Sequence, residues 1–217
     1  MSATLPRAAI LISGSGTNLQ AFIDRAADGR LDARLGLVVS NRDDAYGLVR
    51  ASKANIPTAV IRHTDFDTRE AFDRRLAEEL DAAGTELIAL AGFMRILSPW
   101  FVRRYLGRLL NIHPALLPKY PGLDTHQRVL DAGDKHHGST VHFVTEELDA
   151  GPCLLQGRLE VAPSATADDL RDRVQQLEHR IYPEALNWVA TGRARYNEGM
   201  AVIDDGARPA PVIVDFD

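Results

Sequence analysis

The stretch Ala8-Ala9-Ile10-Leu11-Ile12-Ser13-Gly14-Ser15-Gly16-Thr17-Asn18 decides the fold of this chain. Its apolar part, Ala8–Ile12, predicts a short strand, and the two glycines that follow predict a tight turn. A helix is expected from Asn18 onward. A strand that passes through a tight turn into a helix is the start of the crossover unit from which parallel sheets are built.

The same alternation continues through the first half of the chain. We predict strands at Ala8–Ile12, Leu35–Ser40, Thr58–Ile61, Leu87–Ala91 and Leu109–Ile112. We predict helices at Asn18–Ala27, Ala45–Ala54, Asp67–Ala83 and Pro99–Tyr105. Leu87–Leu90 contains no polar residue, as is usual for a sheet covered on both faces. The expected fold class is therefore α/β, with a Rossmann-like open, mostly parallel sheet flanked by helices.

The predicted third helix has clear end signals. Asp67 can cap its first turn, Glu70 can complete a capping box, and Gly84 ends the helix. Arg69 is unusual there, because a cation in the first turn opposes the helix dipole. Arg69 is either solvated or placed to meet an anionic ligand.

The pattern changes after Asn111. Val141–Val144 and Leu154–Leu159 predict a pair of strands that run antiparallel to each other. Thr166 opens a last long helix, which we expect Pro183 to kink or break. The last ten residues carry two prolines and are expected to form a loose terminal extension.

The composition excludes several classes of protein. With 217 residues the chain is long enough for one large domain, and its net charge of −5 argues against nucleic-acid binding. The apolar run Ala8–Ile12 is too short to span a membrane. Cys153 is the single cysteine, so no internal disulfide forms and a reducing, cytoplasmic location is expected.

The glycine turn Gly14–Asn18 has two interpretations. It is either a plain strand-to-helix connection or a phosphate site formed by backbone N–H groups at a helix N-terminus. No lysine follows the second glycine, so it is not a P-loop, and Leu19 stands where a dinucleotide site needs a third glycine. If it binds a ligand, we expect a single phosphate monoester.

A second candidate site combines Asn111, His113 and Asp149. Asn111 and His113 are two residues apart, so on a strand their side chains point the same way, and Pro114 places both at the strand exit. Taken alone, each is as well explained by a structural role, and Asp149 by a turn with Gly151. Together, an amide, a titratable ring and an acid suit chemistry in which a carbonyl oxygen becomes negatively charged.

Two histidine features have plainer explanations. His136 and His137 lack a spaced third ligand, so we expect two exposed loop histidines and no metal site. His142 lies on an apolar strand, where a hydrogen-bonded core histidine is the default and a role in support of Asp149 is the alternative. The chain also has no serine nucleophile elbow and no base beside Cys153, so a covalent mechanism is not expected.

The loop after the fourth predicted strand, Gly92–Leu97, is the remaining candidate. Ligands of open parallel sheets bind outside the carboxyl ends of the strands. Backbone groups there can read the edge of a flat heterocycle while Ile96 and Leu97 pack on its face. The alternative is ordinary core with Arg95 exposed.

The chain resembles the folate-dependent glycinamide ribonucleotide formyltransferases of purine biosynthesis over nearly its whole length. The stretches that carry the resemblance are Leu11–Gly14, Ala91–Leu97, Leu110–Gly122, His137–Val144 and Leu148–Pro152. Ser15 stands where a related sequence has asparagine, and Thr17 replaces a serine. These departures touch only the details of phosphate binding.

The resemblance implies transfer of a formyl group from the co-substrate 10-formyltetrahydrofolate to the amine of glycinamide ribonucleotide, without a metal. It implies catalytic roles for Asn111, His113 and Asp149. It also implies binding roles for other residues: Gly16, Thr17, Asn18 and Glu178 on the ribonucleotide side, and Arg69, Met94, Arg95, Ile96, Leu97 and Asn111 on the folate side. A single formyltransferase domain follows, with residues 1–112 as its phosphate-binding half, 113–190 completing the active site and 191–217 as the extension.

The expected mechanism is direct attack of the amine on the formyl carbon. Asn111 and protonated His113 would donate hydrogen bonds to the oxyanion, while Asp149 favours the charged ring and assists proton transfer. The oligomeric state is left open between monomer and homodimer. No nucleic-acid or membrane partner is expected.

Three rivals can be weighed against this hypothesis. Methionyl-tRNA formyltransferase shares a similar core but carries an additional C-terminal domain, and formyltetrahydrofolate deformylase carries an N-terminal one. The chain length favours neither. A non-catalytic sensor of nucleotide phosphate would explain the glycine turn, but not Asn111, His113 and Asp149 together.

Overall fold

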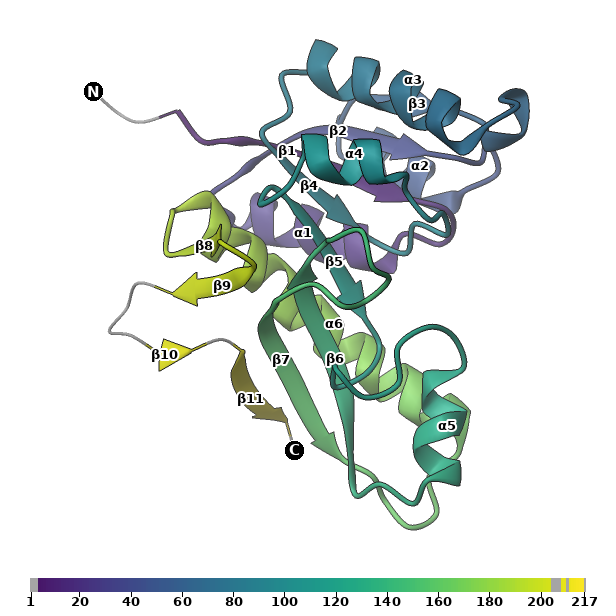
Figure 1. Ribbon diagram of the computed structural model, residues 1–217, viewed down its shortest axis with the longest axis vertical. Helices are drawn as coiled ribbons and strands as arrows, with labels where there is room; N and C mark the ends of the chain where they lie inside the picture. The colour runs from purple at the N-terminus through teal and green to yellow at the C-terminus, as the bar shows by residue number, and fades with distance from the viewer. Residues whose placement is uncertain (1–3, 204–207, 210, 217) are drawn as a thin grey trace.

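The computed structural model describes residues 4–203, 208–209 and 211–216, and its centre is a twisted sheet (Figure 1). The strands of this sheet are β1 (Arg7–Ile12), β2 (Arg34–Ser40), β3 (Thr58–Val60), β4 (Leu87–Leu90), β5 (Leu109–His113), β6 (His136–Phe143), β7 (Cys153–Glu160) and β11 (Val212–Phe216). Their order is β11-β7-β6-β5-β4-β1-β2-β3. The run from β3 to β5 is parallel, whereas β6 and β7 are antiparallel to their predecessors. The predicted fold class and the antiparallel pair are confirmed.

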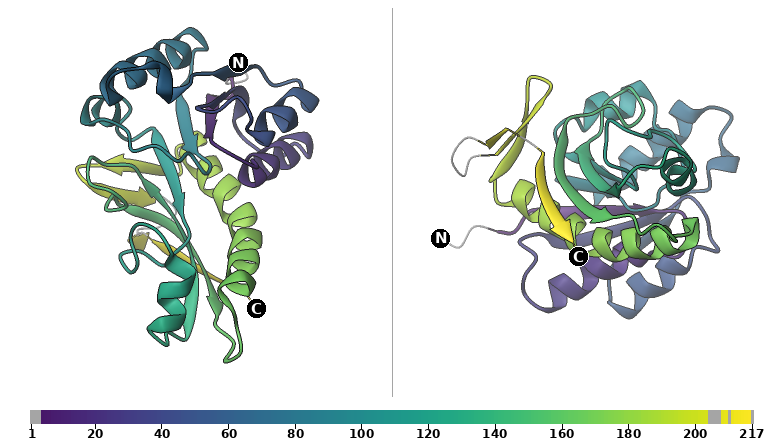
Figure 2. Two further views of the ribbon diagram at one scale, coloured as in Figure 1. Left: turned by 90° about the vertical axis from the view of Figure 1, so that its right-hand side faces the viewer. Right: turned by 90° about the horizontal axis from the view of Figure 1, so that it is seen from below.

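Helices cover both faces of the sheet (Figure 2). They are α1 (Thr17–Ala27), α2 (Tyr46–Lys53), α3 (Arg69–Ala82), α4 (Pro99–Arg104), α5 (Thr125–Asp131) and α6 (Ala167–Ala190), with a 3₁₀ turn at His63–Asp65. Ile10 packs in one core cluster with Phe22 of α1 and residues of α6, while its neighbour Leu11 packs in the other with α3 and α4. Alternate residues of β1 therefore pack on opposite faces of the sheet, which explains the unbroken apolar sequence of this strand.

Two predicted helix details are wrong. Thr68, not Asp67, caps α3, because its side chain accepts a hydrogen bond from the N–H of Ala71. Glu70 consequently pairs with Arg74 one turn later and closes no capping box. The end at Gly84 is as predicted, since Gly84 adopts a left-handed φ of 64°.

The long helix α6 begins as predicted but does not break. Thr166 and Asp169 form a capping box at its start, and the helix runs through Pro183 to Ala190. The hydroxyl of Tyr182, just before the proline, lies 3.0 Å from the carbonyl oxygen of Leu90 and 3.1 Å from that of Leu110. These contacts hold the middle of α6 against the end of β4 and the start of β5.

The C-terminal part contains structure that the sequence did not suggest. A small antiparallel sheet consists of β8 (Ala194–Asn197), β9 (Met200–Ile203) and β10 (Arg208–Pro209). The expectation of a loose extension is wrong for β11, which pairs in parallel with β7 along its whole length. Arg158 and Asp215 form a two-point ion pair across these strands, at 2.6 and 3.0 Å. Within the described residues, no helix has the length and apolar character needed to cross a membrane.

Candidate active site

The candidate site begins where β5 ends. Asn111 and His113 lie on this strand, which stops at His113 as the following proline predicts. β6 runs antiparallel to it and places His142 opposite Asn111 and Thr140 opposite His113. Both predicted side chains line one cavity of about 830 Å³.

Asp149 reaches the same cavity from the turn between β6 and β7. Its Oδ2 lies 3.4 Å from Nδ1 of His113 and accepts a hydrogen bond of 3.0 Å from the N–H of Gly122. Its backbone φ of 52° is left-handed, which is uncommon for a residue other than glycine. Gly151 makes this turn possible, because a Cβ there would lie 1.8 Å from the carbonyl oxygen of Phe143. The structure therefore brings the amide, the ring and the acid together.

The ring of His113 is held on both sides. Its Nε2 lies 2.8 Å from the carbonyl oxygen of Tyr120, and a carbonyl can only accept, so Nε2 carries a hydrogen. Its Nδ1 faces Asp149, and the residue is 5% exposed. In this conformation the Nε2 hydrogen is directed to the backbone of Tyr120.

His142 supports Asn111 rather than Asp149. Its Nδ1 donates to the carbonyl of Phe143 at 3.0 Å, which leaves Nε2 to accept from Nδ2 of Asn111 at 3.2 Å. Its contact with Asp149 is longer, at 3.8 Å. Burial lowers the pKa of His142, in keeping with this neutral ring. The contact orients the amide of Asn111 and leaves its second N–H free.

The glycine turn is held tightly by its neighbours. Gly16 precedes α1 with a φ of 69°, and a Cβ there would lie 2.6 Å from the Cα of Gly47. The N–H of Gly47 donates to the carbonyl of Gly14 at 3.0 Å. Thr17 is half-buried, and Asn18 is 9% exposed. Only glycine at position 16 allows α2 to approach this closely.

Glu178 of α6 lies between the glycine turn and β5. Its Oε2 accepts from Nδ2 of Asn18 at 2.9 Å, and its Oε1 lies 3.0 Å from Oγ of Ser139 on β6. That hydroxyl is also 2.8 Å from the carbonyl oxygen of His113. Burial raises the pKa of Glu178. Ser139 lies in the stretch His137–Val144, which carries the family resemblance. Its neighbours in the sequence gave no indication that it would contact both Glu178 and the backbone of His113.

The loop Gly92–Leu97 forms another wall of the cavity. Met94 and Ile96 are 69% and 56% exposed, whereas Leu97 is buried and Arg95 is half-buried. The N–H of Met94 donates to Oγ of Ser13 at 2.8 Å, which fixes the loop to the end of β1. Large exposed apolar side chains beside a cavity indicate a surface that a ligand covers.

Arg69 lies outside the group of residues that lines this cavity and is exposed at the start of α3. It is electrostatically linked to Arg95 through Asp73, a fully buried acid that sequence reasoning missed. Burial raises the pKa of Asp73, while hydrogen bonds from Ser98 and the charges of Arg69 and Arg95 lower it. Asp73 accepts a hydrogen bond of 2.5 Å from the N–H of Ser98 and so anchors the start of α4.

Comparison with known proteins decides the family, since the formyl transferase family model matches residues 6–186. The chain belongs to the formyl transferase family. The phosphoribosylglycinamide formyltransferase of Escherichia coli is 50% identical over 200 residues, which cover 92% of this chain and 94% of that protein. The Haemophilus influenzae enzyme of the same name is 44% identical, with 94% and 97% covered. A solved phosphoribosylglycinamide formyltransferase from Coxiella burnetii superposes with a TM-score of 0.89 at 49% identity, covering 93% of this chain and 94% of its own.

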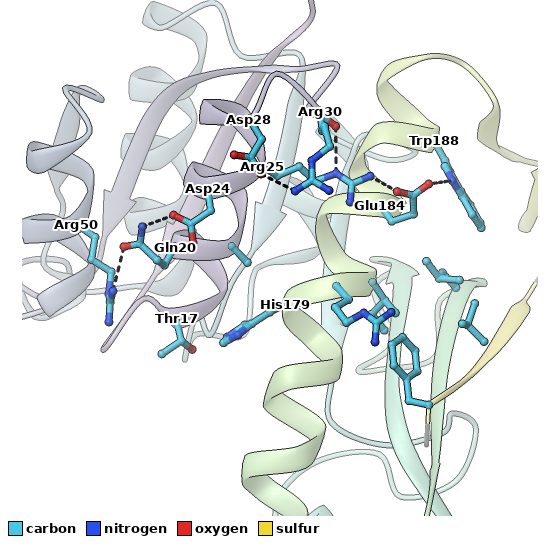
Figure 3. Close-up of a pocket in the computed structure, with 16 residues that line it drawn as sticks. Thr17, Gln20, Asp24, Arg25, Asp28, Arg30, Arg50, His179, Glu184 and Trp188 are labelled. Atoms are coloured by element: carbon cyan, nitrogen blue, oxygen red, sulfur yellow. Dashed lines mark hydrogen bonds and ion pairs between the residues drawn. The ribbon is translucent and has the colours of Figure 1, made fainter.

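This formyl transferase has a second pocket, of about 670 Å³, beside α1 and α6 (Figure 3). Thr17 and His179 line it near the glycine turn. Nε of Arg50 donates to the carbonyl of Ser15 at 2.9 Å, and its Nη1 donates to Oε1 of Gln20 at 3.0 Å. Further along, Arg25 forms an ion pair with Glu184. The contacts of Arg50 fasten the turn to α1 and α2, and the pair of Arg25 with Glu184 joins α1 to α6.

The expectation of two exposed loop histidines is wrong in part, because both lie on β6 and only His136 is exposed. His137 is buried on β6, 1% exposed, and its Nε2 lies 2.8 Å from Nδ1 of His126 on α5. Burial lowers the pKa of His137 to about 4 and also lowers the pKa of His126. Cys153 is half-buried, and burial raises the pKa of its thiol, which disfavours the nucleophilic thiolate.

Proposed function

We propose that this formyl transferase moves the formyl group of 10-formyltetrahydrofolate to the amine of glycinamide ribonucleotide, a step of purine biosynthesis. The similar enzymes named above are phosphoribosylglycinamide formyltransferases, and the similarity extends over more than nine-tenths of the chain. The observation that carries the proposal is the meeting of Asp149 with His113, 3.4 Å apart, in a cavity that Asn111 also lines.

The chemistry begins with attack of the neutral amine on the formyl carbon. The new N–C bond gives a tetrahedral oxyanion, and collapse breaks the bond to the folate nitrogen, which takes up a proton as it leaves. The free N–H of Asn111 donates to the oxyanion. Removing one such donor costs about 100- to 1000-fold in turnover.

His113 and Asp149 act together in this scheme. Substrate binding exchanges the carbonyl of Tyr120 for the oxyanion as the acceptor of the Nε2 hydrogen of His113. Asp149 supplies a negative charge beside the ring and accepts the amine proton, directly or through water. No step uses a metal or a covalent intermediate on the enzyme.

The binding residues divide between the two halves of the domain. Within residues 1–112, Gly16, Thr17 and Asn18 hold the phosphate, and the loop Met94–Leu97 holds the flat folate ring. Arg69 and Arg95 attract its anionic tail. Residues 113–190 supply His113, Asp149 and Glu178, the last of which contacts the ribonucleotide. The C-terminal segment, 191–217, extends this single domain.

The decisive test varies the acceptor. Purified protein is incubated with 10-formyltetrahydrofolate and glycinamide ribonucleotide, charged initiator tRNA or water alone, and loss of the formyl cofactor is followed by absorbance. We expect turnover with the ribonucleotide only. Faster loss with tRNA, or equal loss with water, would replace the proposal with one of the two related formyl-folate activities. Binding of the ribonucleotide without turnover would indicate a sensor.

A further inference from the structure

A continuous line of buried polar groups joins the glycine turn to the strand that carries His113. It runs from Nδ2 of Asn18 to Oε2 of Glu178, from Oε1 of Glu178 to Oγ of Ser139, and from Oγ to the carbonyl oxygen of His113. The successive distances are 2.9, 3.0 and 2.8 Å. Ser139 is fully buried, and Glu178 is 8% exposed. All three distances are those of hydrogen bonds, and each hydrogen bond contains one hydrogen.

The hydroxyl of Ser139 has one hydrogen but lies at hydrogen-bond distance from two oxygens, Oε1 of Glu178 and the carbonyl oxygen of His113. The carbonyl can only accept, and it also accepts from the N–H of Ala115 at 2.8 Å. Both contacts of Ser139 are therefore hydrogen bonds only if the carboxyl group of Glu178 carries a hydrogen. With an ionised Glu178, one of the two contacts would join two oxygen atoms with no hydrogen between them.

The surroundings supply no compensating cation. Among the residues that the structure describes, none forms an ion pair with Glu178. Tyr182, one turn along α6, directs its hydroxyl to the carbonyls of Leu90 and Leu110. The side-chain amide of Asn18 donates one hydrogen bond to Glu178, which offsets only part of the cost of burying a charge there. A buried, unpaired carboxylate is costly, whereas a carboxylic acid is not.

We infer that Glu178 is held as a neutral carboxylic acid and that Ser139 is a positioning residue, through which Glu178 orients the backbone of His113. The direction of the Glu178 pKa shift, upward because of burial, agrees with this geometry. The structure thus assigns Ser139 to the function of the site although it does not line the main cavity.

The inference deepens the proposed function and rests on it in one respect. Glycinamide ribonucleotide carries a phosphate, so an ionised Glu178 in contact with it would add like charge to a buried site. A neutral acid can bind the same ligand without that repulsion. Glu178 also links Asn18, which lies beside the phosphate, to the end of β5 through Ser139.

The protonation state can be measured without any turnover. Glutamate labelled with ¹³C in its side-chain carboxyl group is incorporated, and the infrared spectrum is recorded at pH 7. We expect the carbonyl stretch of a protonated acid with the isotope shift, which separates it from buried Asp73. The band should vanish in Glu178→Gln and persist in the matched control Glu160→Gln, which changes an exposed glutamate. No labelled acid band in the wild type, or its persistence in Glu178→Gln, would overturn the inference.

The positioning role of Ser139 has a kinetic test. Ser139→Ala should raise the KM for glycinamide ribonucleotide and lower kcat/KM about tenfold, as for the loss of one buried hydrogen bond. The KM for formyl folate should not change. Ser139→Thr keeps a hydroxyl and should restore activity. Unchanged kinetics in the alanine variant, or a folded threonine variant that is equally impaired, would refute the role. If the ribonucleotide is not the acceptor, the infrared result still stands, so the two proposals fail separately.

Discussion

The group of Asn111, His113 and Asp149 and the loop Gly92–Leu97 line one cavity but are built in opposite ways. The side chains of His113 and Asp149 are 6% and 7% exposed, and each is held by backbone groups of the loop after β5. Met94 and Ile96 in the loop are 69% and 56% exposed, and the loop is fixed by a hydrogen bond from the main-chain N–H of Met94 to Ser13.

The difference separates chemistry from recognition. Groups that act on a developing charge work best when they are already oriented, because no reorganisation is then needed during the reaction. Exposed apolar side chains of a binding site are removed from water only when the ligand covers them, so they contribute free energy to binding. We therefore expect changes in the buried group to lower kcat and changes on the folate side to raise KM.

The largest effect is expected for Asp149→Asn. The amide can still accept from the N–H of Gly122, so the turn should remain folded, but the charge beside His113 and the proton acceptor are lost. Turnover should fall by about 100- to 10,000-fold while both ligands still bind. Steady-state kinetics and calorimetric titration measure the two properties. Near-normal turnover would remove Asp149 from the mechanism.

Asn111→Ala should come next, with a loss of about 100- to 1000-fold in kcat because one oxyanion donor is removed. His142→Gln is its matched control. It keeps a polar partner near the amide and does not touch the oxyanion, so its loss should be smaller. If the two variants were equally impaired, Asn111 would be acting through the packing of β5 and β6.

A smaller effect, confined to binding, is expected for Arg69→Ala. Loss of one exposed charged contact to the folate tail should raise the KM for formyl folate about tenfold and leave kcat nearly unchanged. Arg74→Ala, on the same helix and paired with Glu70, is the control. An unchanged KM would return Arg69 to the solvated role that its sequence position also allows.

The smallest effect concerns stability and comes from Glu178→Gln. The pKa of Glu178 is raised in the folded protein, so its contribution is complete below the ordinary pKa of glutamate and is lost as the pH rises toward the raised value. The Glu178→Gln variant does not lose stability in this way, because glutamine does not titrate. The melting temperature of the variant relative to the wild type should therefore increase from pH 4 to pH 8. A difference independent of pH would contradict the shift.

Much of the fold could be predicted because its signals are local. The apolar run of β1 and the capping box of α6 each depend on neighbouring residues. The shared direction of Asn111 and His113 follows from the period of a strand. The cap of α3 was missed by one residue because Asp67 and Thr68 are both good caps, and only the fold decides between them.

Other features depend on partners far along the chain. β11 becomes a strand because the edge of β7 is free to pair with it, and nothing within Val212–Phe216 specifies that edge. His137 is buried because α5 covers it with His126. In the same way, His142 orients Asn111 only because β5 and β6 pair in this register.

The sequence by itself determined the parallel α/β order, the glycine turn and the types of residue in the candidate active site. These follow from residue periodicity and from the conformations open to glycine and proline. Only the tertiary structure decided that Asp149 meets His113 and that Ser139 joins Glu178 to the same strand. The reason is physical, because a buried polar atom must find a partner, and which partner it finds depends on how distant segments pack.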